Sequence, residues 1–220
     1  MGVKVIITGS TGMVGEGVLL ECLQNENVEK VLILNRKSYP ISHPKLEEIL
    51  IKNFFELSSI NGKAEDYDAC FFCAGVSSVG MSEVDYTKVT YDMTLSVANF
   101  FSKENANMIF TYVSGKSTDS SEQGKLMWAR VKGRTENDLV KLPFKAVYNF
   151  RPGFMEPVKG QRNIKPLLKI LLLLTPILKL ILPRSVCTLT EVGQAMVNSV
   201  TKGYHKNILE VADIKSLAKN

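Results

Sequence analysis

The chain has 220 residues, of which 45% are hydrophobic and 22% are charged, the proportions of an ordinary soluble globular protein. This length is enough for one well-filled α/β domain with a small appendage. Four cysteines do not make a disulfide framework in a chain of this size, which excludes a small disulfide-stapled secreted fold. A reduced, cytoplasmic setting is therefore expected, with no signal peptide before the first apolar run.

The net charge of +5 is unevenly distributed along the chain. Residues 1–150 carry 16 Lys and Arg against 18 Asp and Glu, and residues 151–220 carry 11 against 4, which together give the totals of 27 and 22. The basic excess thus lies in the C-terminal third, where it favours an anionic partner. A nucleic acid is not expected as that partner.

A glycine-rich turn follows the first apolar run, which spans residues 3–7 and predicts a buried strand. The turn, Thr8-Gly9-Ser10-Thr11-Gly12-Met13-Val14-Gly15, opens an apolar-periodic stretch that predicts a helix. The first N–H groups of such a helix lack partners and lie at the positive end of its dipole, so they favour an anion. The turn is therefore predicted to bind a pyrophosphate through Gly9, Thr11, Gly12, Met13, Val14 and Gly15.

The spacing Thr-Gly-x-x-Gly-x-x-Gly at residues 8–15 resembles that of the short-chain dehydrogenase/reductase superfamily, in its extended, epimerase-like or its atypical branch. The resemblance covers residues 3–155 well and the remainder loosely. It implies a Rossmann fold and a nicotinamide dinucleotide cofactor.

Later apolar runs predict the remaining strands, at residues 28–34, 53–57, 67–74, 108–113, 145–150 and 208–211. Apolar spacing predicts helices over residues 41–52 and 82–103. Cys70 and Cys73 are three apart on one strand and should face opposite sides of the sheet, so they neither pair nor bind zinc. His43 and His205 lack metal-ligand spacing, and no metal site is expected.

The end of the second strand indicates which dinucleotide is preferred. An NAD enzyme usually places an acid there on the adenosine ribose, whereas this chain has Asn35, Arg36 and Lys37. Arg36 can clamp a 2′-phosphate through two charge-assisted hydrogen bonds, so NADP(H) is favoured over NAD(H). The alternative is that Arg36 and Lys37 belong to an ordinary solvated loop.

The resemblance also implies cofactor contacts at the ends of other strands. Leu57 falls where the superfamily contacts adenine, and Ala74 with Gly75 resembles the small-residue turn beside the ribose and phosphates. Arg151-Pro152-Gly153 resembles the turn beside the nicotinamide. Each of these segments can also be a plain turn at the end of a strand.

Three residues are candidates for catalysis. Ser114 ends the fifth predicted strand, where the superfamily places a Ser that hydrogen-bonds a substrate carbonyl, and a Tyr-x-x-x-Lys pair on the next helix then supplies the proton and holds the ribose. Lys132 matches that Lys, but Trp128 stands in place of the Tyr. Ser120 and Gln123 predict a capping box at the start of this helix.

The exchange of Tyr for Trp128 leaves the chemistry open, because an indole N–H donates a hydrogen bond but does not ionise usefully. One interpretation is that another group supplies the proton, either Tyr86, Tyr91 or Tyr112, or Ser114 through a water. The other is that the chain binds the nucleotide without turnover. Trp128 can also be a helix residue that packs into the core.

The C-terminal third contains a leucine-rich basic segment at residues 167–182, within residues 157–190 that carry no acid. Its 16 residues are too short to span a bilayer, since they extend only ~24 Å as a helix. It either caps the substrate cleft and packs on a partner subunit in a homo-oligomer, or lies in a membrane interface through residues 159–184. Thr188 and Glu191 predict a capping box for a further helix.

The sequence thus predicts a doubly wound, mostly parallel sheet in the order 3-2-1-4-5-6, with a possible seventh strand. Residues 1–155 should form the dinucleotide-binding core, and residues 156–220 a substrate-side cap integrated in the same domain. The expected function is that of an NADP(H)-binding oxidoreductase or epimerase-like enzyme acting on a small, apolar carbonyl compound. The alternative is a non-catalytic redox sensor that holds NAD(P).

Overall fold

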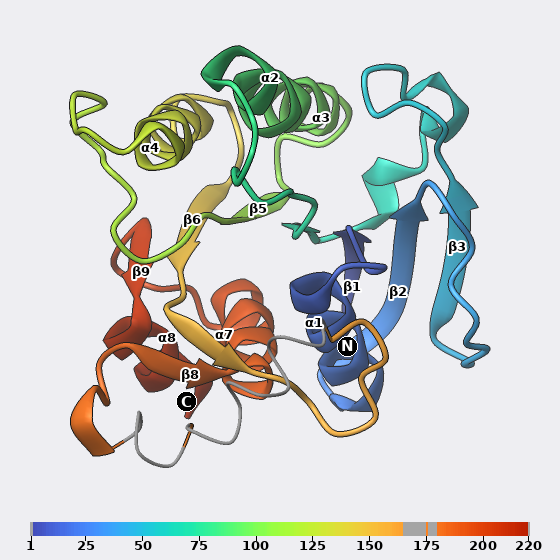
Figure 1. Cartoon of the computed structure of the whole chain (residues 1–220). Helices are drawn as coiled ribbons and strands as arrows, with labels where there is room; N and C mark the ends of the chain where they lie inside the picture. Colours follow the sequence, from blue (N-terminus) through green and yellow to red (C-terminus); the bar gives the residue numbers. More distant parts are fainter. Residues whose placement is uncertain (1, 165–174, 176–179, 220) are drawn as a thin grey trace.

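The computed structural model of the chain describes residues 2–164, 175 and 180–219. A parallel sheet of seven strands, in the order β3-β2-β1-β4-β5-β6-β9, runs through the centre of the molecule. Figure 1 shows β3 at one edge of this sheet and β9 at the other. The predicted fold class and strand order are confirmed, and the seventh strand is present.

The strands of this sheet are β1 (Val3–Thr8), β2 (Val28–Asn35), β3 (Leu46–Leu50), β4 (Ala69–Phe72), β5 (Ile109–Val113), β6 (Ala146–Arg151) and β9 (Ile208–Glu210). The α-helices are α1 (Met13–Gln24), α2 (Glu83–Thr87), α3 (Met93–Glu104), α4 (Met127–Leu139), α7 (Leu189–Thr201) and α8 (Val211–Ala218). Two 3₁₀ turns, η1 (Ser58–Ile60) and η2 (Ala64–Asp66), precede β4, and a π-helical turn, η3 (Lys88–Asp92), joins α2 to α3.

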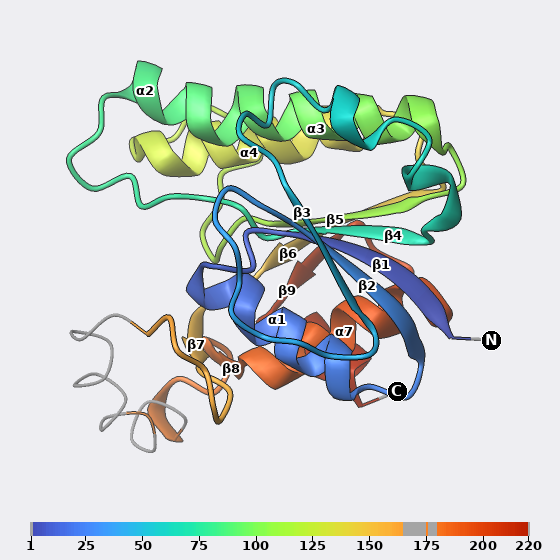
Figure 2. The ribbon, with the colours of Figure 1, turned by 90° about the vertical axis from the view of Figure 1, so that its right-hand side faces the viewer.

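Each face of the sheet is covered by its own layer of helices, as Figure 2 shows. Helices α1, α7 and α8 bury one set of apolar side chains, and α3 and α4 bury the other. Successive side chains of a strand alternate between the two layers, and because both faces of the sheet are covered by helices, both sets of side chains are apolar. Cys70 belongs to one core and Cys73 packs against the other, so the expectation that they face opposite sides is confirmed.

The third strand lies earlier in the chain than predicted. Residues 46–50 form β3, so the predicted helix over 41–52 and the predicted strand over 53–57 are both wrong. The apolar positions 46, 49 and 50 fit a helical period, but residues 46–50 pair in parallel with residues 31–35 of β2 and form an edge strand instead. On this edge strand Glu47 faces outward and pairs with Lys30 of β2 at 2.8 Å.

Helix α4 begins later than predicted. Its first residue is Met127, with Leu126 at the N-cap position, so the predicted capping box of Ser120 and Gln123 is wrong. Ser120 instead accepts a hydrogen bond from Arg151 at 2.6 Å. The capping box predicted for α7 is confirmed, since Thr188 Oγ1 accepts from the Glu191 amide at 3.0 Å and Glu191 accepts from the Thr188 amide.

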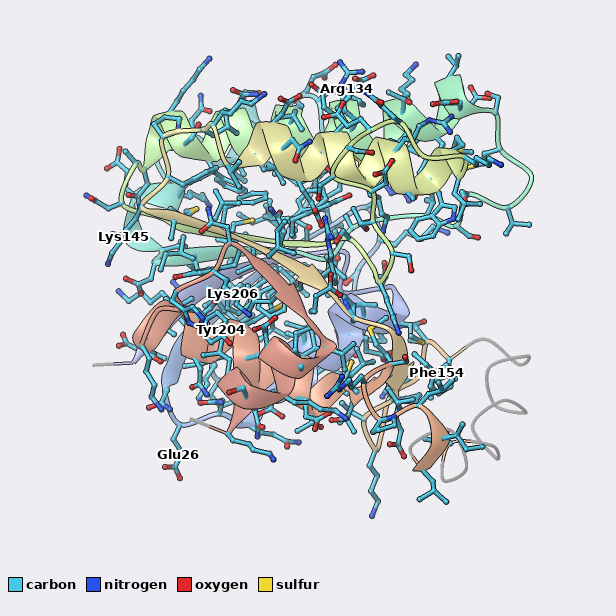
Figure 3. The ribbon with its side chains drawn as sticks, turned by 90° about the vertical axis from the view of Figure 1, so that its left-hand side faces the viewer. Glu26, Arg134, Lys145, Phe154, Tyr204 and Lys206 are labelled. Atoms are coloured by element: carbon cyan, nitrogen blue, oxygen red, sulfur yellow. The ribbon has the colours of Figure 1, made fainter. Side chains whose placement is uncertain are left out.

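A second, two-stranded parallel sheet was not predicted. It pairs β7 (Phe154–Glu156) with β8 (Val186–Thr188) and lies beside the carboxyl ends of the main strands (Figure 1). Figure 3 labels Phe154 on β7 below the main sheet and Arg134 in the helical layer above it. The two short strands bring residues before and after the leucine-rich segment into one place.

Most of the leucine-rich segment lies outside the described residues, which include only residues 175 and 180–182 of it. Both of its predicted roles, the cap and the membrane contact, therefore remain predictions. In the described part of the chain, no helix combines the length and the apolar character needed to cross a bilayer.

A fully buried carboxylate on α1 binds residues 162 and 163, which precede the leucine-rich segment. Glu16, in the first turn of α1, accepts hydrogen bonds from the Tyr39 hydroxyl at 2.9 Å, the Arg162 amide at 2.9 Å and the Asn163 amide at 2.7 Å. The Gln161 side chain donates to the Met13 carbonyl beside them. No sequence pattern predicts this contact, because the two residues that it joins, Glu16 and Arg162, are 146 positions apart in the chain.

Replacing Glu16 with Ala should destabilise the protein, because it leaves the Tyr39 hydroxyl and two amides without their acceptor. We expect a loss on the order of 2 kcal/mol in the free energy of unfolding. Chemical denaturation measures this loss, and trypsin should also cleave faster after Arg162. Glu26→Ala is the matched control, because Glu26 is exposed, as Figure 3 shows. Equal stability of the two variants would contradict this role of Glu16.

Candidate functional site

The glycine turn between β1 and α1 is built by close backbone contact. Gly9 has φ of +75°, and a Cβ on it would lie 2.6 Å from the Ala74 amide nitrogen after β4. A Cβ on Gly15 would lie 2.2 Å from the Gly9 carbonyl oxygen. Only glycine fits these two positions, because the turn is pressed against β4 on one side and against α1 on the other.

Two further glycines, Gly12 and Gly75, are not required by backbone contacts as close as those at Gly9 and Gly15. Gly12, the N-cap of α1, has φ of −97°, and a Cβ there would approach nothing closer than the Gly9 oxygen at 3.3 Å. A Cβ on Gly75 would meet nothing within 4 Å. Among the described residues, no side-chain cap is found at the N-cap of α1, since that position is Gly12. These features leave open backbone where a ligand can approach closely.

Two cavities lie along the carboxyl edge of the sheet. One, which we call the Arg36 cavity, has a volume of about 290 Å³, and the other, the Lys132 cavity, has about 400 Å³. Residues 73–76 line both of them, so the cavities are neighbours on either side of the turn after β4. Their place at the carboxyl ends of parallel strands is where open α/β sheets bind ligands.

Most of the predicted site residues line one of these cavities. Those in the Arg36 cavity are Gly9, Thr11, Gly12, Asn35, Arg36, Ala74 and Gly75, and those in the Lys132 cavity are Val14, Ala74, Gly75, Ser114, Lys132, Pro152 and Gly153. Those that line neither cavity are Met13, Gly15, Lys37, Leu57, Trp128 and Arg151. Sequence analysis missed Phe54 in the first cavity and Lys116 in the second.

The Arg36 cavity differs from prediction at its apolar wall. Leu57 is buried in the core instead of ending a strand, because the predicted strand over 53–57 is absent. Phe54, three residues earlier, lines the cavity in its place. Arg36 is exposed at the cavity, and no ion pair or hydrogen bond of its guanidinium is found among the described residues.

Asn35 joins the glycine turn to the turn that carries Arg36. Its Oδ1 accepts from Ser10 Oγ at 2.9 Å, and its Nδ2 donates to Glu48 at 3.0 Å. Glu48 also accepts from the Ser38 hydroxyl at 2.6 Å and from the Tyr39 amide at 2.9 Å. Burial opposes its charge, but these three hydrogen bonds lower the pKa of Glu48. The carboxylate therefore stays ionised and holds the turn in place.

The Ser114 hydroxyl is engaged by the protein itself. Its Oγ lies 2.5 Å from Glu136 Oε1 and 3.1 Å from the Phe150 carbonyl oxygen, which both compete for one hydroxyl proton. Glu136 is 1% exposed and forms an ion pair with Arg151 at 2.5 Å. The Arg151 side chain is therefore engaged by Glu136 and lines neither cavity, and its predicted cofactor contact stays a prediction.

Lys132 reaches the cavity from α4. Its Nζ donates to the Ser114 carbonyl, and lies 3.4 Å from the Val113 carbonyl oxygen, which leaves one of its three protons for another acceptor. Burial lowers the pKa of Lys132 to about 8, and the Glu136 carboxylate opposes that shift. The ammonium is thus held at the cavity wall with a proton that is exchangeable near neutral pH.

No tyrosine takes the place of Trp128 at the described cavity walls. Tyr86 and Tyr112 are each 2% exposed, and burial raises the pKa of both. Tyr91 donates to Asp138 at 2.6 Å on the outer helical layer. Trp128 itself is half-buried and belongs to neither hydrophobic core. The tyrosines proposed as proton donors therefore lie outside both cavities.

The arrangement matches a known family. A sequence model of the NAD dependent epimerase/dehydratase family matches residues 5–126 of the chain. The chain belongs to this family. The match begins in β1, includes the glycine turn and both cavity-lining turns after β4 and β5, and ends just before α4. The predicted superfamily is thereby confirmed.

The chain is also similar to curated fungal proteins. The protein named FMP52-1, mitochondrial, of Scheffersomyces stipitis is 27% identical over 163 residues, which are 71% of each chain. The FMP52 protein, mitochondrial, of Meyerozyma guilliermondii is 24% identical over 154 residues, 69% of this chain and 65% of that one. The cytoplasmic location expected from the sequence is contradicted by these names. Free cysteines are compatible with the cytoplasm and with a mitochondrion, so they do not separate the two.

Solved structures share the fold at low sequence identity. MoeE5 in complex with UDP-glucose and NAD has a TM-score of 0.68 and 14% identity, with 98% of this chain and 80% of that chain covered. A short chain dehydrogenase from Burkholderia cenocepacia in complex with NADP has a TM-score of 0.65 and 16% identity, with coverage of 99% and 92%. These structures hold either dinucleotide, so they do not decide between NAD and NADP.

Replacing Gly75 with Leu should weaken dinucleotide binding without harming the fold, because the new side chain would enter space shared by both cavities. We expect stability within about 0.5 kcal/mol of the parent. The affinity for NADPH should fall at least about tenfold, by fluorescence titration. Ser77→Leu adds the same side chain at an exposed position two residues away, outside both cavities, and should bind normally. Unchanged affinity in the Gly75 variant would place the ligand elsewhere.

Proposed function

We propose that the protein is an NADP(H)-dependent oxidoreductase that acts on a small carbonyl compound. One observation carries this proposal: the adjoining cavities run from Arg36, whose guanidinium has no ion pair among the described residues, to Lys132, past the open backbone of Gly12 and Gly75. Open backbone at the helix N-terminus suits a pyrophosphate, and a cation at each end suits the rest of an anionic dinucleotide. When bound, the dinucleotide supplies or accepts a hydride.

Arg36 supports NADP(H) as the preferred form. Its guanidinium is exposed, lines the cavity and is not committed to another described residue, so a 2′-phosphate could engage it through two parallel hydrogen bonds. The turn beneath it is held by Asn35 and Glu48, so little ordering is needed on binding. Lys37 is exposed but does not line the cavity, and we assign it no contact.

Lys132 is proposed to serve twice. Its position at the Lys132 cavity suits a contact with the ribose hydroxyls, as the superfamily resemblance implies. Its pKa of about 8 also suits proton donation to the oxygen of a carbonyl that is being reduced. In this role Lys132 would replace the Tyr that the superfamily uses. Ser114 is better suited to positioning than to catalysis, because its proton is shared between Glu136 and Phe150.

A redox sensor that binds NADP(H) without turnover is the second candidate. The engaged Ser114 hydroxyl and the position of Trp128 outside both cavities favour it. Assays of NADPH oxidation with a panel of aldehydes and ketones separate the two functions. Turnover of any compound supports the enzyme, whereas tight NADPH binding with no turnover supports the sensor. The names of the fungal relatives support a mitochondrial location for either one.

Replacing Arg36 with Ala should weaken binding of NADPH by about 10- to 100-fold, because it removes a charge-assisted contact with the 2′-phosphate. Binding of NADH, which lacks this phosphate, should change by less than about threefold. Fluorescence titration with each dinucleotide measures both values. Lys37→Ala removes the neighbouring charge outside the cavity and should leave both affinities near those of the parent. Equal losses for the two dinucleotides would overturn the role of Arg36.

The rate of carbonyl reduction should fall as the pH rises through about 8, because Lys132 then loses the proton that it donates. Lys132→Arg keeps the charge but holds its proton far above this pH. This variant should reduce the substrate about 10²- to 10⁴-fold more slowly, with no fall near pH 8. Its affinity for NADPH should remain close to that of the parent. A wild-type rate that is flat between pH 7 and 9 would remove Lys132 as the proton donor.

A further inference from the structure

The charged side chains in the described lining of the Lys132 cavity are all cationic. Its described lining includes two cationic side chains, Lys116 and Lys132, and no carboxylate. The remaining lining is mostly apolar or backbone, with Val14, Val76 and Met155 among its side chains. A cavity of this composition attracts an anion with an apolar body more readily than a neutral, hydroxyl-rich molecule.

Lys132 alone does not account for this charge. Its ammonium lies near Glu136 and is bound by two backbone carbonyls, and the proposed function already gives it a place beside the cofactor. Lys116 has no ion pair among the described residues, and its side chain is exposed at the cavity. The second cation is therefore not explained by the dinucleotide site.

Lys116 is held in place from two separate parts of the chain. Its amide donates to the Pro152 carbonyl at 2.8 Å, and its Nζ donates to Ser185 Oγ, 69 residues later. Ser185 is fixed in turn, because its carbonyl accepts from the Phe154 amide at 2.7 Å where β7 and β8 meet. The ammonium is thus fixed over the same turn, residues 152–154, that borders the cavity.

We propose that Lys116, positioned by Ser185, forms a subsite for the anionic group of the substrate, a carboxylate or a phosphate monoester. This inference rests on the proposed function and names the substrate class of the same site, a carbonyl compound that carries an anion. Ser185 Oγ accepts one of the three ammonium protons of Lys116, so the other two remain available to the anion.

The surrounding charge favours the approach of such a substrate. Residues 157–190 contain no acid, and Lys159, Arg162 and Arg184 of this stretch are exposed. A field of one sign around a cavity raises the local concentration of ions of the opposite sign, and salt weakens the effect. Arg184 directly precedes Ser185 in the chain, so this basic stretch is proposed to help attract the substrate that Lys116 would bind.

The test compares three series of aldehydes and ketones of matched length, ending in a carboxylate, a phosphate monoester or the uncharged methyl ester. NADPH oxidation should be at least about tenfold more efficient, as kcat/KM, with one anionic series than with the esters. The better of the two anionic series identifies the group that is bound. In Lys116→Met this preference should disappear, chiefly through KM, and in Ser185→Ala it should shrink. Equal efficiency with esters and anions would overturn the subsite.

Calorimetric titration gives a readout that does not need turnover. The carboxylate and phosphate compounds are titrated into the protein loaded with NADP⁺, and binding should weaken about tenfold or more in Lys116→Met. Lys159→Met is the control, because it removes an exposed charge of the same basic stretch outside the cavity. No anion binding to the loaded parent would overturn the subsite alone. Failure of NADPH to bind the parent would instead overturn the proposed function.

Discussion

The architecture of the site depends on the close approach of two backbone segments, the glycine turn after β1 and the turn after β4. The absence of a Cβ at Gly9 lets this turn lie against Ala74, and the absence of one at Gly15 brings α1 down onto the turn. This contact sets the height of the α1 N-terminus above the sheet edge. The two cavities then form on either side of residues 73–76, with walls supplied by the ends of β2 and β5 and by the turns after β1, β5 and β6.

Buried polar contacts join the strands and the helix that border the Lys132 cavity. The buried pair of Glu136 and Arg151 joins α4 to β6, and Ser114 at the end of β5 is bound to the same carboxylate. Removal of the Arg151 charge would leave the buried Glu136 carboxylate without its ion-pair partner among the described residues, which is costly in a protein interior. The superfamily resemblance implies ligand contacts for Ser114 and Arg151, but in this structure their side chains bind Glu136 and so join α4, which carries Lys132, to β5 and β6.

The sequence predicted those parts of the molecule whose signals are local. Buried strands such as 28–34, the glycine turn and the Thr188 capping box each depend on neighbouring residues, and the structure contains them. The third strand was missed because a five-residue edge strand has too few positions to separate a period of 2 from a period of 3.6. Contacts between distant residues could not be predicted at all. Glu16 with Arg162 and Lys116 with Ser185 have no signal in the sequence.

The two-sided engagement of Asn35 limits how this fold can change its choice of dinucleotide. The side-chain amide of Asn35 uses both of its polar atoms. Its oxygen accepts a hydrogen bond from the Ser10 hydroxyl, and its nitrogen donates one to Glu48. An aspartate here, the residue with which many Rossmann proteins recognise a ribose, would place a second carboxylate against Glu48 and lose that donor. Under the proposed preference for NADP(H), a change toward NAD(H) would therefore require a substitution at position 36, or a joint exchange of positions 35 and 48.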